Sequence, residues 1–385
     1  MRVAIIGGRL QGLEAVYLAK KAGWQTLLVD KEAAVPAAGL CDRFLCLDAL
    51  NAADQKKLHK VLDHDIDLII PALENSFVLK ILTKISAATG VPLAFDSSAY
   101  DLSSSKLKSD RYFADHQIPA PLPWPGGTYP YLAKPSGSSG SEGVILLESE
   151  KDLQQFKEKT TDCEEQWVIQ EYIEGPSYSI EVIGDGTNFL PLQVTDLYMD
   201  QVYDCKRVIA PSALAVGLQS DFAALAERIA SGIGLWGIMD VEVILHSGHL
   251  KVLEIDARLP SQTPTAVFHS TGVNMLELLA AVFTGDRLQE LLLENPEKAA
   301  IFEHIVVNPE NLQTAGEHVI ASAGPLNHLS NFFGAEEALT NFLPSSENWV
   351  ATLITTGRNR EEAFAKRDEV LTKIAQELNL KRGCD

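Results

Sequence analysis

The segment spanning residues 240–265 constrains the fold and the chemistry of this chain more than any other. It contains two runs in which apolar, often β-branched residues alternate with polar ones, on either side of Ser247-Gly248. Apolar residues at every second position, on both sides of a short turn, predict a β-hairpin. Because side chains two residues apart share a face of a strand, each run presents two carboxylates on one side. The acids of the two runs are Asp240, Glu242, Glu254 and Asp256.

The two pairs of carboxylates share one face of the hairpin only if the connection has an odd number of residues. We therefore predict an odd-length loop around Ser247-Gly248. Arg258, Ser261 and Thr263 follow the second run directly. Carboxylates that converge beside a cation bind a hard divalent metal together with phosphate oxygens, an arrangement that suits Mg²⁺. The alternative, open at this point, is that the four acids face water separately as a solvated surface.

The composition excludes several classes of protein. The chain has 385 residues, 46% hydrophobic and 22% charged, as expected for an enzyme of two or three domains. Its net charge of −20, without a local basic patch, argues against a nucleic-acid partner. No apolar run predicts a membrane span or a signal peptide, so we expect no membrane partner. Five cysteines without paired metal spacing indicate reduced thiols, and we expect a cytoplasmic location.

The first thirty residues predict a Rossmann-like βαβ unit. An apolar strand leads into a glycine loop, residues 13–22 have helical periodicity, and residues 24–30 read as a second parallel strand. Gly7 and Gly12 match the outer glycines of a dinucleotide fingerprint, but Arg9 replaces the middle one. An NAD-dependent oxidoreductase is therefore a weak alternative. Asp30 either accepts a hydrogen bond from a ribose or caps the following turn.

A lysine precedes a loop of glycine and serine in the middle of the chain. Residues 131–135 form a predicted strand that carries Lys134 near its end, and the loop covers residues 136–143. Backbone N–H groups of such a loop bind phosphate oxygens, with Lys134 as a point charge. We predict that this loop is a mobile lid that becomes ordered over the phosphates. A flexible surface turn without a ligand is the alternative.

The remaining segments alternate between strands and helices. Residues 65–71 predict a buried strand that ends near Glu74 and Asn75, and Ser103 to Lys106 start a helix. Residues 203–207 predict a loop. A strand followed by an exit turn is predicted at 167–175. Further strands are predicted at 179–186, 300–307 and 350–356, and helices at 222–232, 274–283 and 360–378.

In this order, these parts resemble an ATP-grasp ligase. The resemblance implies an α/β (α+β) fold with a Rossmann-like domain at 1–98, an ATP-grasp domain at 99–298 with a lid at about 112–170, and a C-terminal α+β unit at 299–385. It also implies ATP and Mg²⁺ as cofactors. The implied metal ligands are Glu242, Glu254 and Asp256, although Asp256 stands where the family usually has Asn. Ser177 stands where many members carry an acidic ribose contact.

The same resemblance assigns the remaining site residues. Arg258 and Lys134 have catalytic roles, in which they stabilise the charge that develops during phosphoryl transfer. The residues assigned to ATP are Lys106, Lys134, Ser136, Ser138, Ser139, Gln170, Glu171, Tyr172, Ile173, Arg9, Asp30 and Asp48. The residues assigned to the substrates are Leu10, Gln11, Glu74, Ser179, Glu181, Asp204, Asp240, Arg258, Ser261, Thr263 and Glu303.

Within the family, several motifs are similar to the amide ligases of pyrrolysine biosynthesis. These motifs include Leu73-Glu-Asn75, Tyr203-Asp-Cys205 and the segment 255–265. The resemblance implies that the substrates are 3-methyl-D-ornithine and the ε-amine of L-lysine, and it is compatible with a homodimer. Leu10, Gln11 and Glu74 are then expected to bind the head group of lysine. Another ATP-grasp amino-acid ligase or a carboxylase is the alternative, because it would share the ATP residues.

Overall fold

A computed structural model describes residues 1–63, 65–137, 143–160, 166–285 and 298–383. The chain forms two compact units. Unit 1 contains Met1–Phe95, Cys205–Ser212 and Arg258–Asp385, and unit 2 contains Asp96–Asp204 and Ala213–Ala257. The predicted C-terminal part thus groups with the N-terminal part, so the three predicted segments correspond to two units. The predicted phosphate contacts Ser138 and Ser139 lie outside the described residues.

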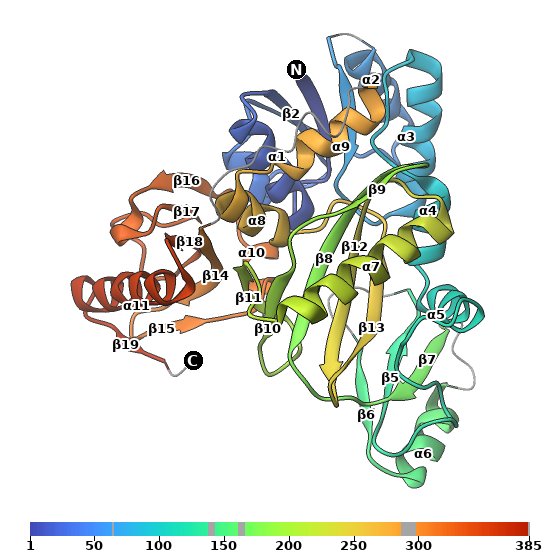
Figure 1. Ribbon diagram of the computed structural model, residues 1–385. Coiled ribbons are helices and arrows are strands. Elements are labelled where there is room, and N and C mark those ends of the chain that lie inside the picture. Colours follow the sequence, from blue (N-terminus) through green and yellow to red (C-terminus); the bar gives the residue numbers. More distant parts are fainter. Residues whose placement is uncertain (64, 138–142, 161–165, 286–297, 384–385) are drawn as a thin grey trace. The chain divides into compact units, whose positions relative to one another are not determined.

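The N-terminal part of unit 1 is a parallel sheet in the strand order β3-β2-β1-β4 (Figure 1). Apolar side chains such as Ile6, Val29 and Leu58 form its core. The predicted Rossmann-like start is confirmed, with α1 between β1 and β2. The elements are β1 (Arg2–Ile6), α1 (Leu10–Lys21), β2 (Gln25–Asp30), a 3₁₀ turn (Pro36–Gly39), β3 (Arg43–Cys46), α2 (Ala52–Leu62), β4 (Leu68–Pro71) and α3 (Ser76–Thr89).

Glycine is required at both ends of the loop between β1 and α1. Gly7 has φ = +107°, where residues with a Cβ are strained. A Cβ at Gly12 would lie 2.0 Å from the carbonyl oxygen of Gly7, so only glycine lets α1 pack this close to the strand. The two glycines that match the dinucleotide fingerprint therefore have a structural role in shaping this loop.

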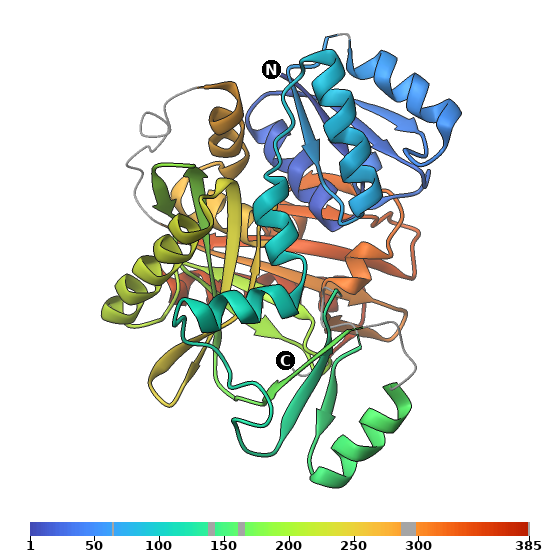
Figure 2. The same ribbon diagram turned by 90° about the vertical axis from the view of Figure 1, so that its right-hand side faces the viewer.

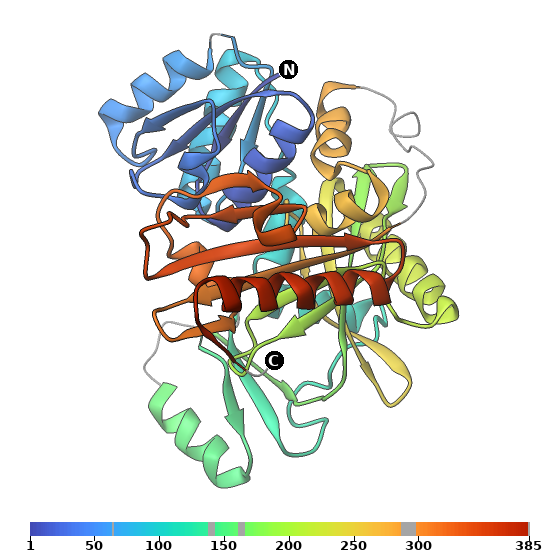
Figure 3. The ribbon, with the colours of Figure 1, turned by 90° about the vertical axis from the view of Figure 1, so that its left-hand side faces the viewer.

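The C-terminal part of unit 1 is an antiparallel sheet covered on one side by α11 (Arg360–Glu377), which runs along β18 (Figure 3). Ile305, Trp349 and Ile374 lie in the core between them. The strand order is β11-β14-β18-β17-β16. The strands are β11 (Cys205–Ala210), β14 (Ala299–Val307), β15 (Asn311–Thr314), β16 (Asn327–Ser330), β17 (Glu337–Thr340), β18 (Trp349–Gly357) and β19 (Lys381–Arg382). The helices are α8 (Thr263–Thr271), α9 (Met275–Thr284), α10 (His318–Ala321) and a 3₁₀ turn (Phe332–Gly334).

The predicted loop at 203–207 is wrong over its second half, because β11 begins at Cys205. The charges of Lys206 and Arg207 suggested a solvated loop. The apolar residues Val208 and Ile209 continue the strand into the core, and Arg207 is buried against an acid. The sequence alone therefore does not distinguish a buried charge that has a partner from a charge on the surface.

Unit 2 contains two antiparallel sheets. One has the order β13-β12-β8-β10 with α7 (Val216–Ile233) packed against β8. The other is a three-stranded sheet, β6-β5-β7, beside α6 (Figure 2). The elements are α4 (Ser97–Ser103), α5 (Lys106–Asp115), β5 (Tyr131–Pro135), β6 (Ile145–Leu147), α6 (Glu150–Thr160), β7 (Trp167–Glu171), β8 (Ser177–Asp185), β9 (Phe189–Pro191), β10 (Thr195–Met199), β12 (Trp236–His246) and β13 (His249–Asp256).

Membrane-spanning potential is low among the helices that the structure describes. No single one of them has both the length and the apolarity of a span. The bent pair Thr263–Thr271 and Met275–Thr284 has the length and apolarity of a span only when the two helices are taken together.

Candidate functional site: the carboxylate face of unit 2 and the acidic loops of unit 1

The carboxylates of the hairpin converge on one face, as predicted. Asp240 lies opposite Asp256, and Glu242 lies opposite Glu254. Directly opposed residues of antiparallel strands point to the same side of the sheet. The alternating residues Met239, Val241 and Val243 are fully buried on the other side. The hydrophobic core therefore places the four acids together on the opposite face of the hairpin.

The predicted reason for this convergence, an odd-length loop, is wrong. The turn contains only Ser247 and Gly248, with φ of 51° and 79°, and His246 pairs directly with His249. Positive φ at both residues is typical of the tight two-residue hairpin turn. A β-bulge supplies the odd residue instead, because Val243 pairs with Val252 whereas Glu242 pairs with Glu254. Leu253 is the extra residue.

Strand β8 extends the carboxylate face. Glu181 lies opposite Asp240 and Ser179 lies opposite Glu242. The hydroxyl of Ser179 donates to Asp240, and it lies 3.4 Å from Oε1 of Glu181. All three of these side chains are buried. The predicted substrate residues Ser179, Glu181 and Asp240 are thus brought together with the predicted metal ligands.

Two lysines balance part of this negative charge. Nζ of Lys106, the first residue of α5, lies 2.8 Å from Oε1 of Glu254. Burial lowers the pKa of Lys134 on β5, while Glu254 opposes that shift and Lys106 adds to it. Burial also raises the pKa of Asp110 to about 6, although Lys134 and Lys106 oppose the shift. Sequence reasoning missed Asp110, and its position one helical turn after Lys106 was the available signal.

Ser136, predicted to bind phosphate, has a structural contact in unit 2. Its hydroxyl accepts from the backbone N–H of Leu107 at 3.2 Å, and its carbonyl accepts from the N–H of Lys106 at 2.9 Å. These contacts satisfy N–H groups at the start of α5, where the N-cap Ser105 makes no side-chain cap bond. The strand that carries Lys134 is therefore tied to the helix that begins with Lys106.

A cavity of about 400 Å³ opens beside the lysines and carboxylates. The predicted residues among its lining are Lys106, Lys134, Gln170, Glu171, Tyr172, Ile173, Glu242 and Glu254. Sequence reasoning missed several further lining residues, namely Glu174, Asp200 and Tyr203. This volume lies in the range of small-molecule sites. A nucleotide is the ligand that such a combination of lysines, acids and apolar wall suits.

The part of the cavity wall formed by the end of β7 is held by side-chain contacts. Oε1 of Glu171 accepts from Nζ of Lys251 at 2.5 Å and from the N–H of Leu122 at 3.0 Å. Burial is the largest single influence on the pKa of Glu171 and raises it, but the hydrogen bonds from Lys251 and Leu122 and the charge of Lys251 together lower the pKa below its usual value. The hydroxyls of Tyr172 and Tyr203 lie 3.3 Å apart. Glu171 thus stays ionised and fixes β7 against β13.

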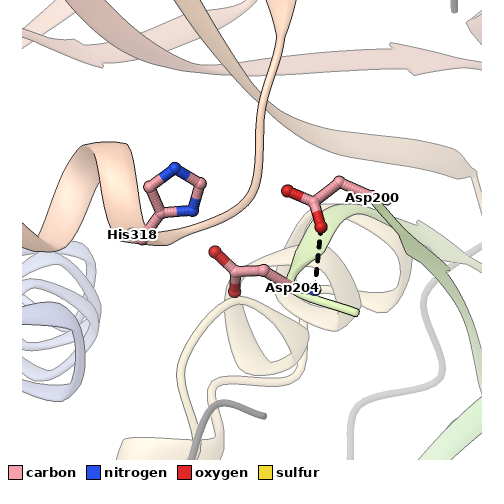
Figure 4. A group of neighbouring side chains, drawn as sticks. All are labelled: Asp200, Asp204 and His318. Atoms are coloured by element: carbon pink, nitrogen blue, oxygen red, sulfur yellow. Dashed lines mark hydrogen bonds between the residues drawn. The ribbon is translucent and has the colours of Figure 1, made fainter. Parts of the chain in front are cut away.

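The turn that leads to Tyr203 is stabilised by an acid. Oδ1 of Asp200 accepts from the N–H of Val202 at 2.9 Å and from the N–H of Asp204 at 3.0 Å (Figure 4). Asp204, a predicted substrate residue, is buried. Asp200 therefore positions the backbone that carries Asp204.

In unit 1, Glu74 connects two other predicted residues. Its Oε1 lies 2.8 Å from Nε of Arg258 and accepts from Nε2 of Gln11 at 2.8 Å. The cap of α3 is Asn75, whose side chain accepts from the N–H groups of Phe77 and Val78. Asn75 rather than Glu74 therefore caps α3, and the carboxylate of Glu74 contacts Arg258 and Gln11.

The loop after Arg258 is held by two acids of unit 1. Glu317 accepts from the hydroxyl of Ser261 at 3.0 Å and from Nε2 of Gln262 at 2.6 Å. Glu14 accepts from the N–H of Thr265 at 2.6 Å, and burial raises its pKa to about 7. Ser261 and the N-terminus of α8, which begins with Thr263, are thus fixed by side chains far away in the sequence.

Glu303, a predicted substrate contact, lies in a buried ion network. Its carboxylate is 1% exposed and is bound by two guanidinium groups. Arg207 donates from Nε to Oε1 at 2.6 Å, and Arg367 donates to both oxygens at 2.7 and 2.8 Å. Glu303 is therefore a buried counter-ion inside unit 1 rather than an open acceptor.

The three N-terminal residues assigned to ATP have local contacts in unit 1. Arg9 donates to Glu32 at 3.1 Å. Asp30 accepts from the N–H of Gly8 at 2.7 Å, and Asp48 accepts from the N–H of Leu50 at 2.9 Å. Asp30 thus orders the glycine loop itself, and the cavity of unit 2 is lined by other residues.

The donor set on the carboxylate face fits a hard divalent cation. Glu242 and Glu254 present carboxylate oxygens from adjacent strands, and Asp256 lies on the same face. Oxygen ligands with open positions for phosphate and water are the environment that Mg²⁺ prefers. None of these three residues offers the nitrogen or sulfur atoms that are typical ligands of zinc.

Comparisons with known proteins agree with this geometry. The family model of the ATP-grasp domain matches residues 103–262, and that of the PylC-like, N-terminal domain matches residues 3–94. The 3-methyl-D-ornithine–L-lysine ligase of Methanosarcina mazei is 36% identical, over 96% of this chain and 94% of the relative. The ligase of Methanosarcina barkeri is 35% identical, over 97% of this chain and 98% of the relative.

Solved structures show the same fold at low sequence identity. The biotin carboxylase domain of Hydrogenobacter thermophilus 2-oxoglutarate carboxylase, a complex with MgADP and bicarbonate, has a TM-score of 0.73 and 17% identity, covering 96% of this chain and 89% of that one. The ADP complex of N5-carboxyaminoimidazole ribonucleotide synthetase has a TM-score of 0.71 and 15% identity, covering 98% and 97%.

Proposed function

The chain belongs to the ATP-grasp family of ligases that includes the 3-methyl-D-ornithine–L-lysine ligases, and we propose that it catalyses the same reaction. As a member of this family it is an ATP-dependent carboxylate–amine ligase. In the proposed reaction, the carboxylate of 3-methyl-D-ornithine takes the γ-phosphoryl group of ATP, and the ε-amine of L-lysine then displaces phosphate to form an amide. The observation that carries the proposal is the shared face of Glu242 and Glu254 beside two lysines and a nucleotide-sized cavity.

The residues of unit 2 have separate tasks in phosphoryl transfer. Lys106 and Lys134 bind phosphate oxygens, and Glu242, Glu254 and Asp256 hold Mg²⁺. When bound, Mg²⁺ neutralises phosphate charge and orients the transferred group. Because Lys106 contacts Glu254 at 2.8 Å, it can exchange this acid for phosphate when the nucleotide binds. Positioning and charge neutralisation suffice for this chemistry.

The two amino-acid substrates require acids, because both carry ammonium groups. Glu181 and Asp240 lie opposite each other beside the metal ligands and are suited to the amines of 3-methyl-D-ornithine. In unit 1, Glu74 and Gln11 are suited to the head group of lysine, and the N–H groups after Gly8 to its carboxylate. Arg258 stabilises the negative charge that develops on the acyl phosphate.

One assay tests the proposal against the remaining alternatives. The purified chain is incubated with ATP, Mg²⁺, 3-methyl-D-ornithine and L-lysine, and the products are identified by mass spectrometry together with ADP release. We expect the lysine ε-amide and one ADP per amide. ADP release that requires bicarbonate would instead indicate a carboxylase. Amide formation from a different pair of amino acids would show another ATP-grasp ligase.

A further inference from the structure

A rare type of turn lies directly before α8 in unit 1. Gln262 has φ = 72° and ψ = −57°, and the N–H of Thr263 donates to the carbonyl oxygen of Ser261 at 2.9 Å. A hydrogen bond between residues i and i+2 with these dihedral angles is the classic γ-turn, which is strained for a residue with a Cβ. Strained backbone of this kind persists only where the surrounding structure holds it, and it is concentrated at functional sites.

Two acids from other parts of unit 1 hold this turn. Oε2 of Glu14 on α1 accepts from the N–H of Gln262 at 3.3 Å, and its Oε1 accepts from the N–H of Thr265 at 2.6 Å. Glu317 accepts from the hydroxyl of Ser261 at 3.0 Å and from Nε2 of Gln262 at 2.6 Å. Glu14 thus binds the backbone of the turn and of the first turn of α8, whereas Glu317 binds side chains.

The burial of Glu14 gives these two backbone contacts unusual weight. Glu14 is 3% exposed, and burial raises its pKa to about 7, although its hydrogen bonds to Thr265 and Gln262 oppose the rise. A buried carboxylate is costly unless it is hydrogen-bonded. An apolar residue at this position would pack without that cost. The acid is therefore explained by the N–H groups that it binds.

We propose that Glu14 is a positioning residue of the reaction, because its ionised carboxylate holds the strained turn at Gln262 and, through it, the segment that carries Arg258 and Ser261. The inference rests on the function proposed above, which assigns Arg258 to the acyl phosphate. The intervening Leu259 is buried, so the segment has little freedom to absorb a shift of the turn. A displacement of about 1 Å in such a group costs up to about 100-fold in rate.

The first test is Glu14→Gln at pH 8. Glutamine has nearly the same shape, but its amide has one acceptor oxygen where the carboxylate has two. We expect kcat for amide formation to fall about 10- to 100-fold. The KM for ATP should not change, because the nucleotide-sized cavity is lined by residues of unit 2. In urea the variant should be at least as stable as the unmodified protein, since it buries no charge.

This combination separates positioning from a purely structural role. A residue that only stabilises the fold would lose stability and activity together when it is replaced. Unchanged kcat in the folded Glu14→Gln protein, or a loss of kcat that parallels a loss of stability, would overturn the proposal.

The pH profile of kcat gives an independent readout. Below pH 7 the carboxyl group of Glu14 is protonated and, like the amide, keeps one good acceptor. The ratio of kcat in the unmodified protein to kcat in Glu14→Gln should therefore rise from near one at pH 5.5 to at least about ten at pH 8. The neighbouring titratable groups are Glu317, whose charge raises the pKa of Glu14, and Tyr17, which donates to Glu337 and contacts His269 of α8. Both proteins contain these groups, so their titration cancels in the ratio, and a constant ratio would contradict the proposal.

Gln262→Gly tests whether Glu14 acts through the turn. Glycine adopts positive φ without strain, so the turn no longer depends on an acid that holds it. In this background we expect Glu14→Gln to lower kcat by at most about twofold, because the two effects are coupled. An equally large loss in both backgrounds would show that Glu14 does not act through Gln262.

The matched control is Glu277→Gln, which replaces a half-buried acid of α9 in the same unit whose pKa is also raised by burial. It should leave kcat and its pH profile unchanged. Hydrogen exchange measured by mass spectrometry gives a readout without substrates, and the segment 258–266 should exchange faster in Glu14→Gln than in the unmodified protein. Failure of the unmodified protein to form the amide would refute the proposed function. Faster exchange with unchanged kcat would refute only the positioning role of Glu14.

Discussion

Glu254 in unit 2 and Glu303 in unit 1 both lie on antiparallel strands and both contact basic side chains, yet their surroundings differ. The side chain of Glu303 is 1% exposed, and Arg207 and Arg367 surround it with side chains that are 7% and 4% exposed. The side chain of Glu254 is 29% exposed and contacts one lysine, Lys106. Planar guanidinium groups satisfy both oxygens of Glu303, whereas a single ammonium group on a flexible stem contacts Glu254.

We infer from this difference that Glu303 stabilises the fold and that Glu254 binds ligands. Removing one member of a buried, fully hydrogen-bonded ion network leaves uncompensated charge in the interior. A lysine beside an open cavity exchanges its acid for phosphate at little cost, because water and other acids replace the contact. We therefore expect Glu303 to control stability and Glu254 to control activity. The following predictions test this contrast.

The largest effect is expected for Glu254→Gln. A neutral amide oxygen replaces an anionic metal ligand, so ADP formation should fall more than about 100-fold, since the loss of an outer-shell partner alone costs about 10–100-fold. The urea unfolding curve should not change. Asp101→Asn is the matched control, because it removes the acid of an exposed lysine pair in the same unit. Near-normal turnover of a folded Glu254→Gln protein would remove Glu254 from the metal site.

For Glu303→Gln we expect the opposite pattern. The variant leaves Arg207 and Arg367 buried without their anion, so the free energy of unfolding should fall by about 3–5 kcal/mol. Urea titration at pH 7 measures the change. Glu362→Gln, which breaks an exposed arginine pair, should show no measurable change. If Glu303→Gln were equally stable but inactive, the structural role of Glu303 would be wrong and a substrate contact would be restored.

Lys134→Met tests whether the lysine beside the carboxylates contributes to nucleotide binding. Lys134 is half-buried beside the acids, and desolvation lowers its pKa, so its charge is poorly solvated without a phosphate partner. A hydrogen bond to a charged group contributes about 1.5–3 kcal/mol, so the Kd for ADP should rise at least about tenfold. Isothermal titration calorimetry gives the Kd. Lys108→Met, at an exposed lysine of α5, is the control and should bind ADP normally.

A smaller, pH-dependent effect is expected for Glu14→Gln. The pKa of Glu14 is raised to about 7 by burial, so the folded chain binds a proton between pH 4.5 and 7 that the unfolded chain releases. Stability of the unmodified protein therefore falls as pH rises through this window, and the variant lacks this loss. The stability of the variant relative to the unmodified protein should rise by about 1–3 kcal/mol from pH 5 to pH 8. Parallel pH profiles from urea titrations would contradict the raised pKa.

The elements that were predicted well from the sequence are those whose apolar residues recur with one dominant period. The alternation in β12 and β13 and the strong βαβ start gave the correct strands and the correct open face. The prediction of an odd-length loop was wrong because a bulge at Leu253 adds a residue inside the strand. Local alternation of apolar and polar residues does not reveal such an insertion. The convergence was thus predicted for the wrong geometric reason.

The candidate site was predicted less completely, because charge partners come from distant segments. Glu303 and its arginines are separated by about a hundred residues in one direction and about sixty in the other, so nothing local distinguishes them from solvated charges. Asp110 was missed because its environment depends on Lys134 and Glu254, which other elements supply. Side chains that depend on tertiary contacts cannot be assigned from spacing alone.

The central contrast is tested most directly by binding of Mn²⁺ in place of Mg²⁺. Electron paramagnetic resonance measures free Mn²⁺ in titrations of the ADP complex of the unmodified protein, Glu254→Gln and Glu303→Gln. We expect the unmodified protein and folded Glu303→Gln to bind Mn²⁺ with the same affinity, and Glu254→Gln to bind it at least about tenfold more weakly. Equal Mn²⁺ affinity in Glu254→Gln, or a loss confined to Glu303→Gln, would contradict the assignment of the metal site to the hairpin.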